Sequence, residues 1–349
     1  MRVLTSVALI VAGCSERAPP PIDDAAVAGW TLEVALPEPI ANNAVAAIAG
    51  SDGCTLVTAA GIDGSLAAGG IHPRAWSLAP SATAWTALPD LPGVPRIAAS
   101  AVTLRGRVYV VGGYSVAAGG SETTHGVVFA LDPAAGWTTV APLPVPIDDA
   151  VAVAWRDRWL VVVSGWSNSA PVAAVQIYDL DSETWAMATP FPGTPVFGHA
   201  GAIVGDDLVI VDGVAASGGG FAAVEQTWRG VLDPDHSTQI AWTSLGDHPG
   251  PARYRAAAGA IGGRMVFHGG TDTPYNFDGR RYDNGSPALP LATAFAFDPL
   301  SAMFADDLPI QAPATMDHRG LVGCGEVGYT IGGIAAGPMT SSQVSSLRL

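Results

Sequence analysis

The sequence is poor in charged residues and in cysteine. Of its 349 residues only 13% are charged, and the cysteines are three, Cys14, Cys54 and Cys324. Acidic residues outnumber basic residues by 31 to 16, so the formal net charge is −15. Nucleic-acid backbones are bound by basic stripes, and the sequence has none. We therefore expect no nucleic-acid partner.

Long apolar runs are lacking as well. After the first dozen residues no stretch is long and apolar enough to cross a bilayer, although 49% of the residues are hydrophobic. This apolar content therefore predicts a buried core. Residues typical of turns and strands are abundant instead, with 42 glycines, 28 prolines and 10 tryptophans.

Familiar catalytic motifs are missing from the sequence too. It contains neither a G-x-S-x-G nucleophile elbow nor an H-E-x-x-H zinc motif. Its seven histidines are scattered without metal-ligand spacing. We expect no metal and no cofactor.

One unit recurs along the chain. Its clearest copy starts at Arg96, continues with predicted strands at 99–104 and 108–111, and ends in a hairpin that contains Trp137. Every copy carries a glycine at the end of its second strand: Gly61, Gly113, Gly165, Gly213, Gly270 and Gly333. Every glycine has a matching aromatic residue: Trp30, Trp85, Trp137, Trp185, Trp242 and Phe304. Regular copies of this length are typical of propeller and array folds.

The spacing of these markers indicates four strands per copy. From each aromatic residue to the next glycine there are 28 to 31 residues, whereas from each glycine to the next aromatic residue there are 20 to 34. We call the strands a to d, from the axis outward. The constant part holds strands d, a and b, where an insertion would slip the pairing register. The variable part holds the b–c loop, which tolerates insertions because it lies in solvent.

The two ends of the repeat array are complementary. Trp30 opens it with an outer strand alone, while residues 318–349 supply strands a, b and c without an aromatic d strand. The N-terminal strand is therefore predicted to complete the last blade and to remove free sheet edges. We predict an all-β fold, a six-bladed β-propeller that covers residues 29–349.

The glycine, arginine and aromatic markers resemble the kelch repeat over essentially all of residues 29–349. Segments 41–43, 146–149, 195–201 and 274–277 are similar to those of bacterial kelch proteins described as galactose-oxidase-like or as cyclically permuted mutarotase-like. The resemblance implies a propeller and says little about chemistry.

Two enzymes that the resemblance suggests need specific residues in their active sites. A copper radical oxidase needs a cross-linked tyrosine and cysteine, and neither Cys54 nor Cys324 suits that role. Sialic acid mutarotase, a six-bladed periplasmic kelch protein, has a glutamate directly after a strand-b glycine and an arginine a few residues later. Here Gly213 is followed by Val214 and then by alanines and glycines, so that pair is not carried over.

The first residues resemble a bacterial lipoprotein signal. Arg2 gives a positive start, residues 3–12 are apolar, and residues 11–14 resemble a lipobox. The resemblance implies removal of residues 1–13 and lipidation of Cys14, with residues 14–28 as a proline-rich tether. An ordinary secretory signal with a chance cysteine is the alternative. Because Ser15 follows the cysteine, we expect a lipid-anchored protein of the outer membrane that faces the periplasm or the cell surface.

Cys54 and Cys324 fall toward the same end of the first and last blades, which ring closure makes neighbours. A disulfide that locks the ring and two buried free thiols are the alternatives.

Strand direction alternates within a blade, so the d–a crossings and the b–c loops share one face, here called the top face. The residues that open the inner strands ring the top of the central channel. The candidate ligand-binding residues among them are Asn43, Arg96, Asp148, Asp149, His199, Arg253, Tyr254, Arg255, His318 and Arg319. A pocket for a small polar ligand such as a sugar acid is one interpretation, and ion pairs that tie the loops together are the other.

The longest b–c loop, residues 271–291 of the fifth blade, adds Tyr275 and Tyr282 to these candidates. We predict that it folds over the channel mouth as a lid. Flat aromatic faces suit carbohydrate recognition, and they also suit an ordinary ordered loop.

Two hypotheses for the function follow. The first is a monomeric binding or scaffold module whose top face takes a glycan-like ligand or a protein partner. The second is a cofactor-free sugar mutarotase or epimerase, with Asp149, His199 and Arg255 as catalytic candidates. A metal between His199 and His318 would need further ligands. The sequence favours binding and leaves enzymatic activity open.

Overall fold

The computed structural model of the chain describes residues 29–306, 308 and 313–349. The predicted signal peptide and tether, with Cys14, lie outside the described residues. Within them, no helix is long and apolar enough to cross a membrane.

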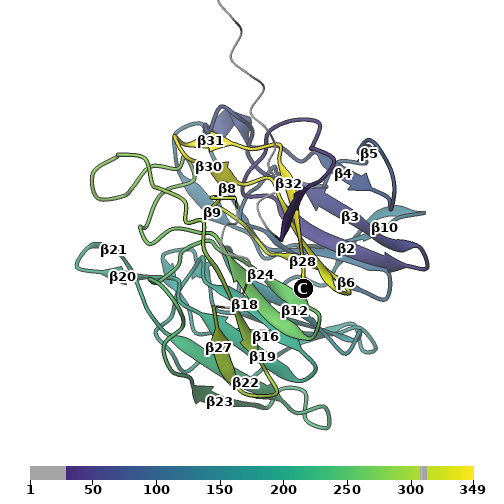
Figure 1. The fold of residues 1–349 in the computed structure, drawn as a ribbon, viewed down its shortest axis with the longest axis vertical. Coiled ribbons are helices and arrows are strands. Elements are labelled where there is room, and N and C mark those ends of the chain that lie inside the picture. The colour runs from purple at the N-terminus through teal and green to yellow at the C-terminus, as the bar shows by residue number, and fades with distance from the viewer. Residues whose placement is uncertain (1–28, 307, 309–312) are drawn as a thin grey trace, which may run out of the picture.

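The described strands form six four-stranded antiparallel sheets arranged as blades around an axis (Figure 1). The inner strands of the first three blades are β2 (Ala44–Gly50), β6 (Ser100–Leu104) and β12 (Val151–Trp155). Those of the other three are β18 (Ala200–Val204), β24 (Ala257–Ile261) and β28 (Val322–Cys324). The prediction of a six-bladed β-propeller is confirmed.

The outer strands complete each blade in chain order. The first blade adds β3 (Gly53–Ala59), β4 (Ala75–Leu78) and β5 (Thr86–Leu88). The second adds β7 (Arg107–Val111), β10 (Val128–Asp132) and β11 (Gly136–Val140). The third adds β13 (Trp159–Val163), β16 (Val175–Asp179) and β17 (Thr184–Met187). The fourth adds β19 (Asp207–Val211), β22 (Thr227–Leu232) and β23 (Ile240–Ser244). The fifth adds β25 (Arg264–His268), β26 (Ala294–Asp298) and β27 (Met303–Ala305).

The sixth blade closes the ring. It contains β28, β29 (Val327–Ile331), β32 (Val344–Arg348) and, as its outermost strand, β1 (Trp30–Leu32). Trp30 pairs with Leu347, so the first strand of the chain does complete the last blade. A disulfide joins Cys54 of β3 to Cys324 of β28 and links the first and last blades a second time, with a Cα–Cα distance of 6.0 Å.

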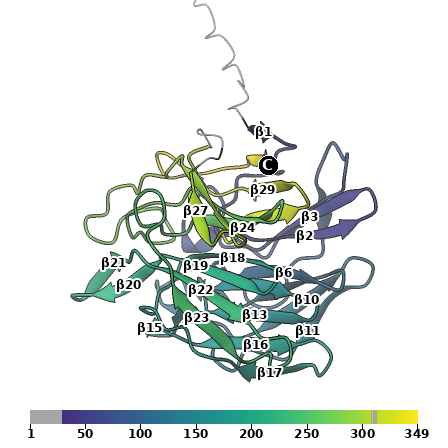
Figure 2. The same cartoon turned by 60° about the horizontal axis from the view of Figure 1, so that its bottom comes forward.

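The b–c connections carry small hairpins of their own, which gather on the top face. They are β8 (Tyr114–Val116) with β9 (Glu122–Thr124), β14 (Trp166–Ser167) with β15 (Ala170–Pro171), β20 (Val214–Ser217) with β21 (Gly220–Ala223), and β30 (Ile334–Ala335) with β31 (Met339–Thr340). The first blade has a short 3-10 turn there, η1 (Ala68–Gly70). Figure 2 shows β20 and β21 projecting from one side and the tip of the β2–β3 hairpin pointing to the other.

The blades pack through apolar second strands. All five residues of β13 are buried, and Val161 and Val163 belong to one cluster with Leu208 and Ile210 of the next blade. A strand covered on both faces reads as a continuous apolar run. The same buried position holds His268, whose side chain is fully enclosed and whose pKa burial lowers to about 3.

The two repeat markers have separate structural roles. The indoles of Trp85, Trp137 and Trp185 donate hydrogen bonds to the backbone oxygens of Val34, Pro89 and Ala141 of the preceding blade. The marker glycines let the segment that opens an inner strand approach the end of the second strand closely. A Cβ at Gly165, whose φ is +122°, would lie 2.6 Å from the Asp148 backbone oxygen. Only glycine fits such a position without strain.

Candidate functional site

A ring of hydrogen bonds, most of them between backbone groups, surrounds the axis at the top face. It contains one residue per blade, here called the top ring: Asn42, Ala98, Asp149, Gly198, Arg255 and Asp317. All six have a positive φ, which is uncommon outside glycine. The N–H of Asp149 donates to Ala98 O at 3.0 Å, that of Gly198 to Asp149 O at 2.8 Å, and that of Arg255 to Gly198 O at 2.6 Å. The left-handed backbone conformation of these residues lets the backbone N–H and C=O groups point along the ring, toward the neighbouring blades.

Four charged side chains meet inside this ring and form what we call the top network: Asp149, Arg255, Asp317 and Arg319. Arg255 lies 2.6 Å from a carboxylate oxygen of Asp149 and 3.3 Å from one of Asp317. Arg319 lies 2.5 Å from Asp149 and 3.1 Å from Asp317. No side chain of the four is more than 3% exposed. The two positive and two negative charges cancel, as burial of charge requires.

The network sets the ionisation of its carboxylates. Burial alone would raise the pKa of Asp149, but the adjacent guanidinium groups of Arg255 and Arg319 outweigh it, and the pKa is lowered. For Asp317 burial prevails over the same two arginines, and the pKa is raised. Aromatic rings cover the network, because the Arg255 guanidinium lies 4.7 Å from the ring centre of Tyr254 and 5.0 Å from that of Tyr275.

Asp149 and Arg255, two of the catalytic candidates, contact each other. An acid–base pair for sugar isomerisation must act on two sides of a ligand, and here the two groups bind each other. His199 lines the same central cavity as Asp149, and its Nε2 lies 2.9 Å from Val163 O. Ion pairs that tie the loops together are the interpretation that fits Asp149, Arg255 and Arg319.

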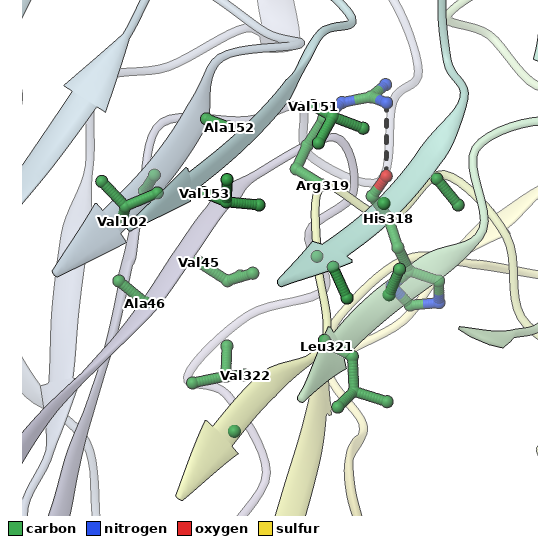
Figure 3. A pocket seen from close by; sticks show the side chains of 18 of the residues that line it. Val45, Ala46, Val102, Val151, Ala152, Val153, His318, Arg319, Leu321 and Val322 are labelled. Atoms are coloured by element: carbon green, nitrogen blue, oxygen red, sulfur yellow. Dashed lines mark hydrogen bonds between the residues drawn. The ribbon is translucent and has the colours of Figure 1, made fainter. Parts of the chain in front are cut away.

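Below the network lies the central channel. Its cavity of about 280 Å³ is walled by the inner strands of all six blades, mostly by alanine, glycine and valine. Figure 3 shows the valines of this wall, Val45, Val102, Val151, Val153 and Val322, with His318 and Arg319 toward one end. The top network therefore separates the channel from the top face.

His199 and His318 both line the closed end of this channel. His318 Nε2 lies 2.9 Å from the hydroxyl oxygen of Thr315. Burial lowers the pKa of each imidazole to about 4, so both are held neutral. Nowhere in residues 29–306, 308 and 313–349 do three His, Cys, Asp or Glu side chains gather as metal ligands.

A second cavity, of about 110 Å³, lies on the other side of the network, and we call it the top pocket. It is formed by loops and strand starts of the second to fifth blades: Tyr114, Glu122, Asp148, Asp149, Trp166, Phe197, Phe221, Arg255, Asn276 and Tyr282. Two of the top-ring positions beside it carry small residues, Ala98 and Gly198. A Cβ at Gly198 would lie 2.2 Å from the ring of Tyr254, so glycine is required there.

Half of the residues that line the top pocket are aromatic. Trp166, Phe197 and Phe221 lie edge to face with one another, at centroid distances of 5.4 to 5.8 Å. Tyr282, from the long loop of the fifth blade, packs on Phe221 at 4.7 Å and is 41% exposed. Tyr275 of the same loop is fully buried and donates its hydroxyl to Asp317 at 3.3 Å. The long loop thus covers the top network.

Two carboxyl groups of the top pocket form no ion pair with a described residue. Asp148 is 4% exposed and accepts a hydrogen bond from the Thr124 hydroxyl at 2.6 Å. Burial and the neighbouring Asp149 raise its pKa well above the ordinary value. Glu122 comes from the β8–β9 hairpin, and desolvation raises its pKa too. Neither forms an ion pair with any of the described residues.

Other candidates from the sequence have structural partners. Asn43 donates to the Thr58 hydroxyl at 2.7 Å, and Arg96 donates to backbone oxygens of Val94 and Gly112. Arg253 donates to Gly269 O at 2.9 Å and stacks on Phe295. These side chains hold loops in place and do not line the top pocket.

Sequence reasoning missed five residues of the top pocket: Tyr114, Glu122, Trp166, Phe221 and Asn276. One signal was present for Trp166, which directly follows the marker Gly165. The residue after a marker glycine pairs with the residue that opens the inner strand, as Trp166 does with Asp148. Glu122, Phe221 and Asn276 come from loops of unequal length and carry no such register.

The chain is similar to kelch proteins over parts of its length. No protein-family profile matches it. It is 27% identical over 111 residues to Kelch-like protein 15 of Gallus gallus, covering 32% of this chain and 22% of that protein. It is 24% identical over 237 residues to Kelch-like protein terF of Aspergillus terreus, covering 63% and 47%. The chain therefore spans between about a fifth and a half of the length of these curated relatives.

Among solved structures, that of YjhT superposes with a TM-score of 0.70 at 16% identity, covering 89% of this chain and 95% of the other. The repeats in the sequence and the arrangement of the backbone indicate the same fold. The chain has the fold of a six-bladed, kelch-type β-propeller. Within the kelch propeller, the top pocket is where loops of four blades meet around aromatic and acidic side chains.

Proposed function

We propose that this kelch propeller is a binding module of the bacterial cell envelope that takes a small polar, glycan-like ligand in the top pocket. The top pocket itself carries the proposal. Aromatic faces stack on the apolar faces of sugars, and the carboxyl groups of Glu122 and Asp148 and the amide of Asn276 suit hydroxyl groups. The cavity of about 110 Å³ admits a small molecule or one end of a longer glycan.

Lipid anchoring through Cys14 at the outer membrane is part of this proposal. The lipobox-like segment 11–14 supports lipid anchoring. The Cys54–Cys324 disulfide supports only a location outside the cytosol, since disulfides persist in oxidising compartments. In this proposal the membrane is contacted only through the anchor, and the propeller acts as a monomer.

The proposal is tested by thermal unfolding of the protein with sugars, sugar acids and cell-wall fragments. A ligand that raises the unfolding temperature should lose its effect in Tyr282→Ala and Glu122→Gln, which alter exposed side chains of the top pocket. Glu183→Gln, an exposed residue of the bottom face, is the matched control and should keep the effect. If no compound raises the unfolding temperature, the small-ligand proposal fails and a protein partner at the b–c loops takes its place.

A second candidate is a cofactor-free sugar mutarotase or epimerase. The raised pKa of Asp148 favours it, because a general acid must hold a proton near neutral pH. In this version Asp148 and Glu122 act on the sugar, while Asp149 and Arg255 remain paired. Anomer exchange followed by NMR, absent in Asp148→Asn, would support it. Exchange at the same rate in Asp148→Asn would exclude this site.

A further inference from the structure

The charges around the top pocket do not balance once the top network is counted as a unit. Arg255, the basic residue in the wall of the top pocket, is already bound to Asp149 at 2.6 Å and to Asp317 at 3.3 Å. Arg319 completes the network, and its four charges cancel. What remains on the wall of the top pocket is Glu122 and Asp148, without ion pairs to described residues.

The burial of Asp148 strengthens this imbalance. Its side chain is enclosed, its neighbour in the chain is the ionised Asp149, and its carboxyl group accepts a hydrogen bond from a neutral hydroxyl, that of Thr124. A buried carboxylate is unfavourable unless a positive charge accompanies it. Burial and the neighbouring Asp149 raise the pKa of this carboxyl group more than the Thr124 hydroxyl and Arg255 lower it, so a bound cation would favour its ionised form.

The aromatic wall has the form that attracts cations. Trp166, Phe197 and Phe221 meet edge to face, and Tyr282 closes over Phe221. The faces of such rings are electronegative, and cages of this kind recognise substituted ammonium groups. The protein itself contains such cation–π contacts, because the Arg255 guanidinium lies over the rings of Tyr254 and Tyr275.

From these observations we infer that the top pocket binds a small organic cation, an alkyl-substituted amine or ammonium group, held by Trp166, Phe221 and Tyr282 and accompanied by the carboxyl groups of Glu122 and Asp148. The inference rests on the proposed function and specifies its ligand. It replaces a sugar acid by an amine-bearing ligand, such as an amino sugar, because the arginine that would bind an acid is already neutralised. The chain's net charge of −15 favours the approach of a cation as well.

A pair of isosteres separates charge from shape. Choline and 3,3-dimethylbutan-1-ol have nearly the same shape, and only choline is charged. We expect isothermal titration of the full chain to show choline binding at least ~10-fold more tightly than the neutral alcohol, in line with a cation–π gain of roughly 1–2 kcal/mol. Glucosamine should likewise bind more tightly than glucose at a pH below the pKa of its amine.

Substitutions in the top pocket test whether choline binds there. Tyr282→Leu and Trp166→Leu should weaken choline at least ~5-fold, because each removes a ring face. Glu122→Gln should weaken choline ~3-fold or more and leave the neutral alcohol unchanged, since it removes charge at constant shape. Tyr282 is 41% exposed, so its replacement tests binding without risk to folding. Glu183→Gln on the bottom face is the matched control.

The outcomes distinguish the two proposals. If the neutral alcohol or glucose binds as tightly as its charged counterpart and Tyr282→Leu weakens both, the inference is wrong and the proposed function stands. If neither charged nor neutral ligands bind, and Tyr282→Leu changes nothing, both are wrong.

Discussion

The charged side chains at the two ends of the propeller axis differ in their burial, although the same six blades build both ends. At the top end, Asp149 and Arg255 are at most 2% exposed and belong to a closed network. At the bottom end, ion pairs such as Arg156 with Asp206 and Arg105 with Asp181 have side chains between 32% and 48% exposed. Exposed pairs contribute little to stability, whereas a buried pair broken on one side leaves an uncompensated charge.

The difference in burial follows from the positions of the strand ends in each blade. Inner strands start at the top, and second strands end there. The buried charged and imidazole side chains of the described residues lie at these positions or in the top-face connections: His72, Arg96, Asp148, Asp149, His199, Asp212, His248, Arg253, Arg255, His268, Asp317 and His318. The bottom end has tight turns and a channel lined by small apolar side chains. Stability, pH response and recognition are therefore concentrated at one end.

The largest effect should come from breaking the top network. We expect Arg255→Ala to lower the free energy of unfolding by about 3–5 kcal/mol, because Asp149 and Asp317 stay buried with only Arg319 to neutralise them. Arg156→Ala, which breaks a bottom pair, should cost no more than about 1 kcal/mol. Denaturant unfolding at neutral pH measures both. Equal losses in the two variants would show that the ends do not differ in this way.

The bottom end has one strong constraint of its own, the disulfide. It joins residues 270 positions apart, and we expect Cys54→Ser to lower the free energy of unfolding by about 2–5 kcal/mol. Cys324→Ser should cost about the same, and the double variant should add little to either, since the residues act as one unit. Ligand affinity at the top pocket should not change. A change in affinity would mean that the blade seam shapes the top pocket.

The sequence predicted what depends on local spacing. Marker glycines and aromatic residues recur because each blade needs the same close approach and the same packing, so blade number and ring closure could be derived from them. The top ring illustrates the limit. Asp149 and Arg255 could be assigned to the channel mouth, but their spacing did not reveal whether they bind a ligand or each other. Phe221 and Glu122 were missed because the b–c loops that carry them share no register with the repeat.

The smallest expected effect concerns a single buried imidazole at the top end. Among the described residues neither ring nitrogen of His72 finds a hydrogen-bond partner, and the residue is 5% exposed. Unsatisfied buried polar atoms are destabilising, so His72→Phe should raise the free energy of unfolding by about 1 kcal/mol at pH 7. Equilibrium unfolding in urea checks this value. His236→Gln, on the exposed bottom face, is the matched control and should change little.

The pH dependence of the same variant gives a second test. Burial lowers the pKa of His72 from 6.5 to about 4 in the folded chain. Between these values the unfolded chain binds a proton that the folded chain does not, so the stability that this histidine contributes is lost as the pH falls from 6.5 toward 4. His72→Phe removes that loss, and its advantage over the parent protein should grow from pH 7 to pH 4.5. An advantage that stays constant, or that shrinks toward pH 4.5, would show that His72 titrates freely and that the top end does not hold it neutral.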